Sequence, residues 1–444
     1  MESIPDAASS LLNYADVKRR ALASRTYRVK IPTSNGQLFQ MGQTMNLDLA
    51  GNMNSSYYDF GQSYFKMTIT NNNAGTAVQL DGNSGAYCLI NRMQLITGGQ
   101  TISDIQNYNV LASALMTQNV STSWSNNVGL NMIGTSGTGA FQGLSIPAGG
   151  SATVCLPFIL TALAGTTPTR YIPAFSRDAL RFRFYLENQV AGLQAGGAIA
   201  STDIQISVPE AIMYVVELSP SAQQLVNAMT GGVYNILCAD YRTANGSFTG
   251  TGAALTTVQT LGFSVSSLER VIVVHRESPN INTQAAQSIG ARVQPTLSEY
   301  QLLINGQAFP ERPILFEGTP GAGDGAETLA ETLVAQHALS DFGHDSCLAQ
   351  QGFLISDPAK FTLQASDGLT EAKTGTFVCA IELESMAGKS ANIYSGISTI
   401  GAVVQFRGVY SAVPALAYDL AFFAQNTILL TLDTGGLGTY IVSV

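Results

Sequence analysis

Five potential metal ligands lie close together in the sequence, between residues 337 and 347. They are His337, Asp341, His344, Asp345 and Cys347. Imidazole, carboxylate and thiolate groups are the side chains that bind Zn²⁺ in proteins, so this cluster could supply a zinc site. Its spacing matches no familiar zinc pattern, however, and the cluster follows a predicted helix within a loop. The simpler interpretation is a polar loop with capping and surface roles, and we expect no bound metal and no cofactor.

Other patterns that could support enzymatic chemistry are incomplete. Histidine is scarce, with three residues in the chain, and no Gly-x-Ser-x-Gly motif is present to hold a serine nucleophile. Residues 318–325 are rich in glycine but lack the lysine of a phosphate-binding loop. Glu382 and Glu384 lie on one face of a predicted strand and would need a further carboxylate partner to act as a glycosidase. Surface or interface charge explains them more simply, so we predict that the protein is not an enzyme.

Positive charge is concentrated at the start of the chain. Residues 1–30 carry six cations against three acidic residues, a net charge of +3, whereas the whole chain has −9, so the other 414 residues carry −12. The cations are Lys18, Arg19, Arg20, Arg25, Arg28 and Lys30. One interpretation is a basic arm that contacts an anionic partner such as nucleic acid or a lipid surface. The other is a solvated helix with an ordinary cluster of charges; because its apolar stripe is thin, we expect this arm to become ordered only against a neighbour.

The composition is low in charge. Charged residues make up 11% of the 444 residues, against about 25% in an average soluble domain, while apolar residues make up an ordinary 45%. A disordered chain would combine low hydrophobicity with high charge, and a long-helix protein would be rich in Glu, Lys and Arg. A large β protein with neutral surfaces fits best. Because charge is depleted at the centres of interfaces, we expect other chains to cover much of its surface; a neutral secreted protein is the alternative.

Signals for cross-linking and targeting are weak. The five cysteines are widely spaced and include no Cys-x-x-Cys pair, which favours small buried thiols in a reducing compartment over a disulfide framework. The first residues lack the basic and apolar regions of a secretory signal. The longest apolar stretch, residues 152–164, is too short to cross a bilayer and contains Pro157.

Strand signals dominate the chain. Apolar and polar residues alternate in residues 64–70, 180–186 and 376–384, which is typical of half-buried strands. In the second of these segments the aromatic side chains are expected to point inward and the arginines outward. The fully apolar runs at residues 212–216, 271–274 and 428–430 suit strands that are covered on both faces. Helix signals are few and fall at residues 104–116, 219–229 and 324–334. The sequence therefore predicts an all-β protein with a few short helices in its loops.

An internal repeat divides the chain. Residues 94–100 (QLITGGQ) have an echo at residues 301–307 (QLLINGQ), at an offset of 207 residues. Each copy is a predicted strand that ends in a glycine turn and is followed by a predicted helix, which favours two similar β domains. The predicted division is a basic arm at 1–30, a first β domain at 31–218, a linker helix at 219–233 and a second β domain at 234–444.

The run at residues 90–111 (INRMQLITGGQTISDIQNYNVL) resembles the first-barrel segment of double jelly-roll major capsid proteins. These proteins form the shells of tailless membrane-containing phages, polinton-like viruses and virophages and are related to the adenovirus hexon. The matching features are a strand, a turn with glycine, an Ile-x-Asp step and Tyr-Asn-x-Leu opening a helix. Residues 170–173 (RYIP), which lead into the strand at 180–186, also resemble a later strand of that barrel.

The resemblance implies two tandem eight-stranded jelly-roll barrels that stand upright in a viral shell. Three copies would form a homotrimer with a pseudo-hexagonal footprint, and trimers would then form the lattice of an icosahedral capsid of a DNA virus. The long loops at residues 117–150 and 308–350 would be exposed towers or clasps between subunits. The arm at 1–30 would lie on the inner side, towards minor capsid or penton proteins, an inner membrane or the genome. The expected location is the virion, after synthesis in the host-cell cytoplasm.

Two other functions compete with the capsid hypothesis. A trimeric viral fibre or adhesin-like protein would share the richness in small polar residues, but it should show elongated repeats and a receptor- or carbohydrate-binding face. A secreted polysaccharide-active protein should show a signal peptide and carboxylates clustered with aromatic residues, and the sequence indicates neither.

Overall fold

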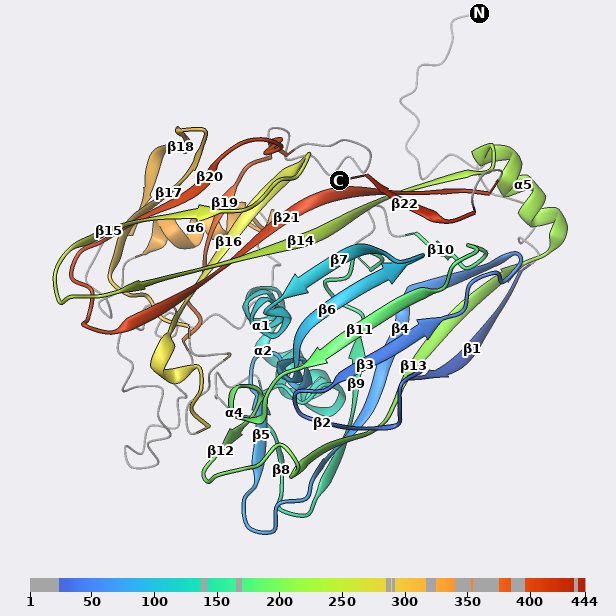
Figure 1. Ribbon diagram of the computed structural model, residues 1–444, viewed down its shortest axis with the longest axis horizontal. Helices are drawn as coiled ribbons and strands as arrows, with labels where there is room; N and C mark the ends of the chain where they lie inside the picture. The colour runs from blue at the N-terminus through green and yellow to red at the C-terminus, as the bar shows by residue number, and fades with distance from the viewer. Residues whose placement is uncertain are drawn as a thin grey trace, which may run out of the picture.

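The computed structural model describes residues 24–136, 142–164, 170–284, 289, 292–316, 325–339, 353, 375–384, 396–434 and 438–443. Within these residues the chain folds mainly as antiparallel strands, which form two barrels side by side (Figure 1). The expectation of an all-β protein with few short helices is confirmed.

The first barrel consists of two facing sheets and a small third one. One sheet has the order β1 (Ser24–Pro32), β13 (Ile204–Leu218), β4 (Ser56–Asn71) and β10 (Ile172–Pro173), with β2 (Leu38–Gln40) on β13 and β9 (Ser151–Pro157) on β4. The facing sheet has the order β3 (Thr44–Leu49), β11 (Leu180–Leu186), β6 (Ile90–Thr97) and β7 (Gln100–Gln106). The small sheet joins β12 (Gln194–Ala195), β5 (Val78–Asp81) and β8 (Gln142–Ile146).

The second barrel repeats this arrangement. Its first sheet has the order β14 (Val233–Thr249), β21 (Ala417–Asp433), β16 (Leu268–Glu277) and β19 (Cys379–Glu382), with β22 (Tyr440–Ser443) on β21. Its second sheet has the order β15 (Leu255–Leu261), β20 (Val404–Tyr410), β17 (Leu297–Ile304) and β18 (Gln307–Leu315).

Both barrels are jelly rolls. When the eight main strands of each barrel are numbered along the chain, one sheet has the order 1-8-3-6 and the other 2-7-4-5 in both cases. This wrapping is that of a jelly roll, in which two Greek keys form a double sheet. The repeat predicted at residues 94–100 and 301–307 falls on equivalent hairpins, because β6 and β17 occupy residues 90–97 and 297–304. The expected double jelly roll is confirmed.

Alternation places the side chains of β11 as the sequence predicts. Leu180, Phe182, Phe184 and Leu186 are buried, and Arg181 and Arg183 point away from the core. The core between the two sheets of the first barrel also contains Met45, Leu47, Phe65 and Ile69. The second barrel has a corresponding core with Tyr300, Phe406, Tyr410 and Phe422.

In the described part of the chain, three helices are longer than two turns. They are α1 (Tyr108–Asn119), α5 (Pro220–Thr230) and α6 (Ala326–Val334). The shorter ones are η2 (Ala86–Leu89), α2 (Thr122–Trp124), η3 (Ser125–Gly129), α3 (Leu130–Met132), α4 (Gln189–Gly192) and η4 (Ser278–Asn280). The Ser219 side chain accepts a hydrogen bond from the Ala222 N–H and caps α5, so the predicted linker helix begins at its serine-proline signal.

Two predicted helix boundaries are wrong. Residues 104–106 belong to β7, and α1 begins only after Asn107, whose left-handed backbone (φ 51°) separates strand from helix. The apolar spacing of residues 105–115 fits a helix, but Ile105 faces the core equally well from a strand. The helix α6 begins after Gly325, which has φ 100° and provides no side-chain cap; Asp324 lies outside the described residues.

The arm boundary predicted at residue 30 also differs from the structure. The strand β1 begins at Ser24 and pairs with β13 along its whole length, with Arg28 opposite Tyr214 and Lys30 opposite Ile212. Tyr27, Val29 and Ile31 pack against the core of the first barrel. Residues 24–30 are therefore part of a sheet, and the cations that alternate with these apolar residues point outward.

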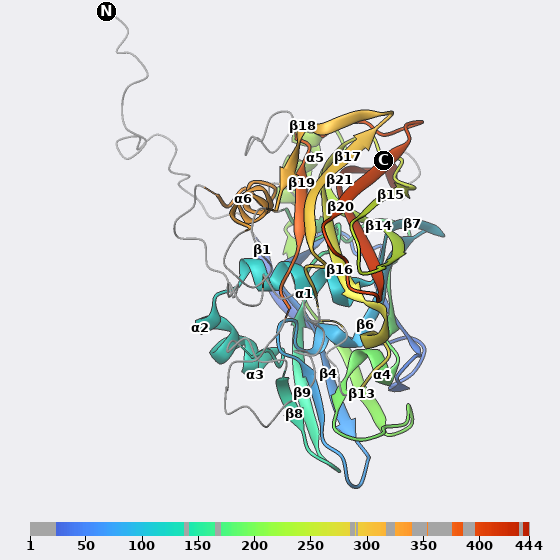
Figure 2. The same ribbon diagram turned by 90° about the vertical axis from the view of Figure 1, so that its left-hand side faces the viewer.

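The two barrels share one buried interface. The sheet β14-β21-β16-β19 turns one face to its own core, with Val271 and Phe422, and the opposite face to the first barrel, with Ile272 and Phe423. This second face lies beside β7 and α1 of the first barrel (Figures 1 and 2). Because the sheet is buried on both faces, the barrels pack as one body.

Polar groups also cross this interface. The Ser103 hydroxyl on β7 donates a hydrogen bond to Asp240 on β14, and both side chains are fully buried. The Thr243 hydroxyl donates to the Gln106 carbonyl at 3.0 Å. Hydrogen bonds between fixed strands restrict how one barrel can slide over the other, so these contacts set the register of the interface.

Candidate assembly surface

Among the described residues, the outer face of the first sheet of the first barrel carries exposed and half-buried side chains. We call its central part the basic face and define it by Arg28, Lys30, Tyr64, Lys66 and Tyr214. Strand register places these residues on one side of the sheet: Lys30 lies opposite Ile212, which lies opposite Tyr64, and Arg28 lies opposite Tyr214. Arg28 and Lys30 are exposed, and the other three are half-buried.

Positive charge exceeds negative charge on the basic face. Glu210 forms ion pairs with two of these cations: its Oε1 lies 3.1 Å from Lys66 Nζ and 3.6 Å from Lys30 Nζ. The Arg28 guanidinium donates a hydrogen bond to the Tyr64 hydroxyl at 3.1 Å. Three cations around one carboxylate leave a local excess of positive charge in a chain whose net charge is −9. Such a surface attracts an acidic partner.

The six cations predicted to form an arm are not equivalent. Lys18, Arg19 and Arg20 lie outside the described residues. Arg25 forms an ion pair with Glu217 at 2.6 Å and lies over the Tyr27 ring, so it adds little to the basic face. Arg28 and Lys30 belong to that face. Sequence reasoning missed Lys66 and Glu210, although the alternation in residues 64–70 placed Lys66 on an outward position.

A groove of about 1280 Å³ lies at one end of the same sheet. It is bounded by β1, β4 and β13, by the helix α5 and by the start of β14. Its walls include the side chains of Tyr57, Tyr171, Tyr234 and Val216, and Asp59 and Arg170 provide charges of opposite sign. Aromatic residues with few charges are typical of protein-binding surfaces. Leu225 and Met229 on the outer side of α5 are 57% and 79% exposed, which extends this uncharged end of the molecule.

Hydrogen bonds hold the wall of the groove in place. The Tyr57 hydroxyl donates to Gln223 Oε1 on α5, and Gln223 Nε2 donates to the Tyr234 hydroxyl, both at 2.9 Å. The ring of Phe175 packs edge-on against Tyr57 and Tyr234, with centroid separations of 5.4 and 5.2 Å. These contacts join the first sheet, the linker helix and the second barrel, so the groove has fixed walls.

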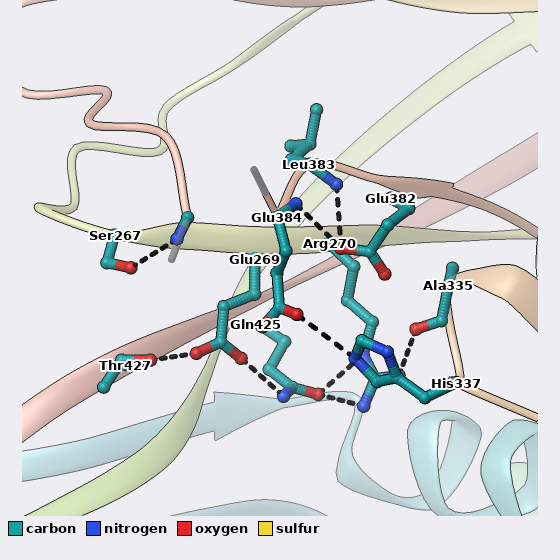
Figure 3. A network of polar contacts seen from close by, with 11 residues as sticks. Ser267, Glu269, Arg270, Ala335, His337, Glu382, Leu383, Glu384, Gln425 and Thr427 are labelled. Atoms are coloured by element: carbon teal, nitrogen blue, oxygen red, sulfur yellow. Dashed lines mark hydrogen bonds and ion pairs between the residues drawn. The ribbon is translucent and has the colours of Figure 1, made fainter. Parts of the chain in front are cut away.

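A polar network lies at the C-terminal end of α6 (Figure 3). The Arg270 guanidinium donates to the Ala335 carbonyl and to Gln425 Oε1, and Gln425 donates to Glu269 at 2.7 Å. His337 lies 3.3 Å from Glu384. The network fastens the end of α6 to the strands β16, β19 and β21, and it includes three of the side chains considered above for chemistry, His337, Glu382 and Glu384.

The carboxylate pair Glu382 and Glu384 has a structural role in this network. Glu382 accepts hydrogen bonds from the backbone N–H groups of Leu383 and Glu384, at 3.0 and 2.8 Å. Burial, together with the nearby Glu384, raises the pKa of Glu382. Both carboxylates are engaged in contacts within the second barrel.

The predicted metal cluster is described only at His337. Asp341, His344, Asp345 and Cys347 lie outside the described residues. Within the part of the chain that the structure describes, no group of three or more His, Cys, Asp or Glu side chains could hold a metal ion. Across the same residues, no helix has both the length and the apolar character needed to cross a membrane.

Four cysteines have free thiols. Cys88, Cys238 and Cys379 are buried and Cys155 is half-buried; Cys347 lies outside the described residues. Burial raises the pKa of each of the three buried thiols. They behave as small core residues, as the sequence predicts.

The two facing jelly rolls place the chain in a structural class, the double jelly-roll proteins. Neither a protein-family model nor a curated protein matches the sequence, but solved structures match nearly all of it. VP54 of PBCV-1, from a structure fitted into the virophage Sputnik, has 12% identity over 97% of this chain and 99% of that chain, with a TM-score of 0.64. The Faustovirus major capsid protein has 9% identity over 93% and 91%, with a TM-score of 0.59. The mavirus major capsid protein has 12% identity over 100% and 96%, with a TM-score of 0.52. The chain therefore has the fold of these major capsid proteins along its whole length.

Proposed function

We propose that this chain is a structural major capsid protein that self-assembles as pseudo-hexameric homotrimers into the shell of an icosahedral DNA virus. The observation that carries the proposal is the pair of jelly rolls joined through a sheet buried on both faces. The chain with this arrangement covers 99% of VP54 and 91% of the Faustovirus major capsid protein. Three rigid pairs give six similar units around one axis, which can tile a closed shell.

The proposed partners follow from the same arrangement. The first partner is a second copy of the chain, then further trimers in the lattice, then minor capsid or penton proteins. We propose that Lys18, Arg19 and Arg20 contact the genome or an inner membrane on the inner side, because clustered cations attract anionic surfaces. The protein would be made in the host-cell cytoplasm and function in the virion, without cofactor and without enzymatic activity.

The fibre or adhesin hypothesis is less well supported. An elongated fibre would carry strand repeats stacked along one axis, whereas the two barrels here lie side by side (Figure 1). The aromatic groove and the exposed Leu225 and Met229 beside it fit contact with copies of the same chain better than they fit exposure on a rod.

Size measurements on the purified chain test the proposal. We expect light scattering after gel filtration to give three times 46.8 kDa, about 140 kDa, at micromolar concentration. Electron micrographs should show compact pseudo-hexagonal blocks or closed shells. A monomer at this concentration, or thin rods in the micrographs, would contradict the proposal.

A further inference from the structure

The contact between the two barrels within one chain brings together defined surfaces. The first sheet of the second barrel covers two elements of the first barrel, the edge strand β7 and the helix α1 that follows it. Nine of the twelve residues of α1 are buried, partly against η2 and β6 of its own barrel. At the contact with the second barrel, the buried Arg292 guanidinium donates a hydrogen bond to the Thr117 hydroxyl of α1 at 2.7 Å. In this contact, the 1-8-3-6 sheet of the second barrel packs on the fifth strand of the first barrel, β7, and on the helix that follows that strand, α1.

The same two kinds of surface occur a second time in the chain, and there the described residues leave both of them partly exposed. The first barrel has its own 1-8-3-6 sheet, whose outer side is the basic face. The second barrel has its own fifth strand and following helix, β18 and α6. On α6 two of nine residues are buried, and on β18 Pro310, Glu311 and Arg312 are exposed. In β7, by contrast, Ser103 is fully buried and donates a hydrogen bond to Asp240 of the second barrel.

We infer that the basic face of one copy docks on α6 and β18 of a second copy, in a contact that repeats between chains the contact between barrels within the chain. The inference rests on the proposed trimer and names its interface. Such an interface joins two different surfaces and is therefore heterologous. Heterologous interfaces form a closed ring when the rotation that relates one copy to the next divides a full turn evenly. With intrachain and interchain contacts alternating, three chains complete a ring of six barrels.

The charges of the two surfaces are complementary. Glu327 and Glu331 stand four residues apart on α6, so they project from the same side of the helix. Neither has an ion-pair partner within the described part of the chain, and burial together with Glu327 raises the pKa of Glu331. Glu311 on β18 is also exposed. Opposite them would lie Arg28, Lys30 and Lys66, whose charge Glu210 offsets only in part.

Complementary charge gives such a contact its specificity and orientation more than its strength. Strength comes from apolar burial, and both surfaces contain suitable residues. Tyr64, Tyr214 and Val216 are half-buried on the sheet, and Ala330 and Val334 are half-buried on α6. These side chains would complete their burial against the second copy.

The helix α6 is held rigidly enough to act as a docking element. Its carboxyl end is fastened by the network of Figure 3, in which Arg270 bonds the Ala335 carbonyl and His337 pairs with Glu384. Inside the helix, Thr332 donates a hydrogen bond to the Thr328 carbonyl at 2.7 Å, and both side chains are buried. A fixed helix binds with less loss of conformational entropy than a mobile one.

Charge reversal tests the inference in the full-length chain. We expect R28E/K30E to raise the concentration at which trimers dissociate by about tenfold or more, and E327K/E331K to do the same. Combining both pairs of substitutions in one chain should restore the wild-type value, because each interface then has its charges exchanged. The matched control is R181E, which reverses an exposed cation on β11, outside the proposed interface; it should leave the trimer unchanged.

Chemical cross-linking tests the same interface on the wild-type protein, so its result does not depend on whether a variant folds. A carbodiimide joins amines to carboxylates in direct contact, so Lys30 or Lys66 should be linked to Glu327 or Glu331 of another copy, as shown by mixing isotope-labelled and unlabelled chains. The Lys66–Glu210 link within one chain is the positive control. Trimers that lack the intermolecular link and survive both charge reversals would overturn the inference and leave the trimer standing. A monomeric wild-type chain would overturn the proposed trimer itself.

Discussion

Replacing Asp240 with asparagine probes the interface between the two barrels. The carboxylate is fully buried, accepts a hydrogen bond from Ser103 and lies 3.6 Å from Arg242. Burial raises the pKa of Asp240 from its ordinary value of 3.8 to about 6, because the charged form loses hydration that Ser103 and Arg242 replace only in part. The folded protein therefore binds this proton more tightly than the unfolded chain does.

The sign and size of the effect follow by linkage. A carboxyl whose pKa is raised by folding contributes stability that is fully present below pH 3.8 and is lost as the pH rises through about 6. A shift of about two units corresponds to about 3 kcal/mol at 1.36 kcal/mol per unit. Since D240N has no charge to bury, its free energy of unfolding relative to wild type should rise by about 3 kcal/mol between pH 3.5 and pH 7.5.

Thermal unfolding of both proteins at equal concentration, from pH 3.5 to pH 8, measures this difference. At about 2.1 cal/mol/K per residue, the unfolding entropy of one cooperative body of 444 residues is about 0.9 kcal/mol/K. A difference of 1 kcal/mol therefore shifts Tm by about 1 °C, and D240N should gain about 3 °C over wild type across this range. Asp104 is the matched control: burial opposes its ionisation, but bonds from Arg92 at 2.7 and 2.5 Å outweigh burial and lower its pKa. D104N should therefore lose stability relative to wild type as the pH rises. A difference between D240N and wild type that does not change with pH would refute the reasoning.

Two further predictions concern the shared sheet and the arm. Phe423 is fully buried on the face of β21 that meets the first barrel, so F423A should cost about 3–5 kcal/mol; calorimetry should show one transition at a lower Tm, and two separate transitions would contradict a single packed body. Deleting residues 1–23 should leave trimers intact and impair shell assembly, as seen by gel filtration and particle yield. Deleting residues 1–30 should also destabilise the fold, because it removes most of β1; equal stability of the two truncated chains would contradict the placement of β1.

Local signals in the sequence were sufficient for the repeated hairpins and the linker helix. The strands at residues 94–97 and 301–304 end in turns that contain glycine, which is a strong local signal for a hairpin. Ser219 followed by proline is a local signal for the start of a helix and does not depend on the rest of the chain. The resemblance to double jelly-roll proteins supplied the arrangement of the barrels, which no local pattern contains. The TM-scores support that arrangement despite identities of 9–12%.

Features that depend on distant partners were harder to predict. Residues 24–30 contain three cations, so the alternation of the inward residues Tyr27 and Val29 is hard to recognise in the sequence. These residues form a strand because they pair with β13, which is far away in the sequence. Lys66 and Glu210 come from strands far apart in the sequence, and their contact depends on the register of β4 with β13. The burial of Asp240 depends on the docking of one whole barrel on another.

The apolar runs of the sequence connect the fold to the proposed interface. Residues 271–274 and 428–430 were predicted to be covered on both faces, and both lie in β16 and β21, the sheet enclosed between the two cores. Residues 212–216 in β13 carry the same apolar pattern, yet Tyr214 and Val216 are only half-buried in the single chain. The first jelly roll thus has the sequence of a sheet with two covered faces, whereas the described residues of one chain fully cover only one of them. A second copy docked on the basic face would supply the missing cover, so the exposed area of Tyr214 and Val216 should fall on trimer formation, as measured by slower hydrogen exchange in β13.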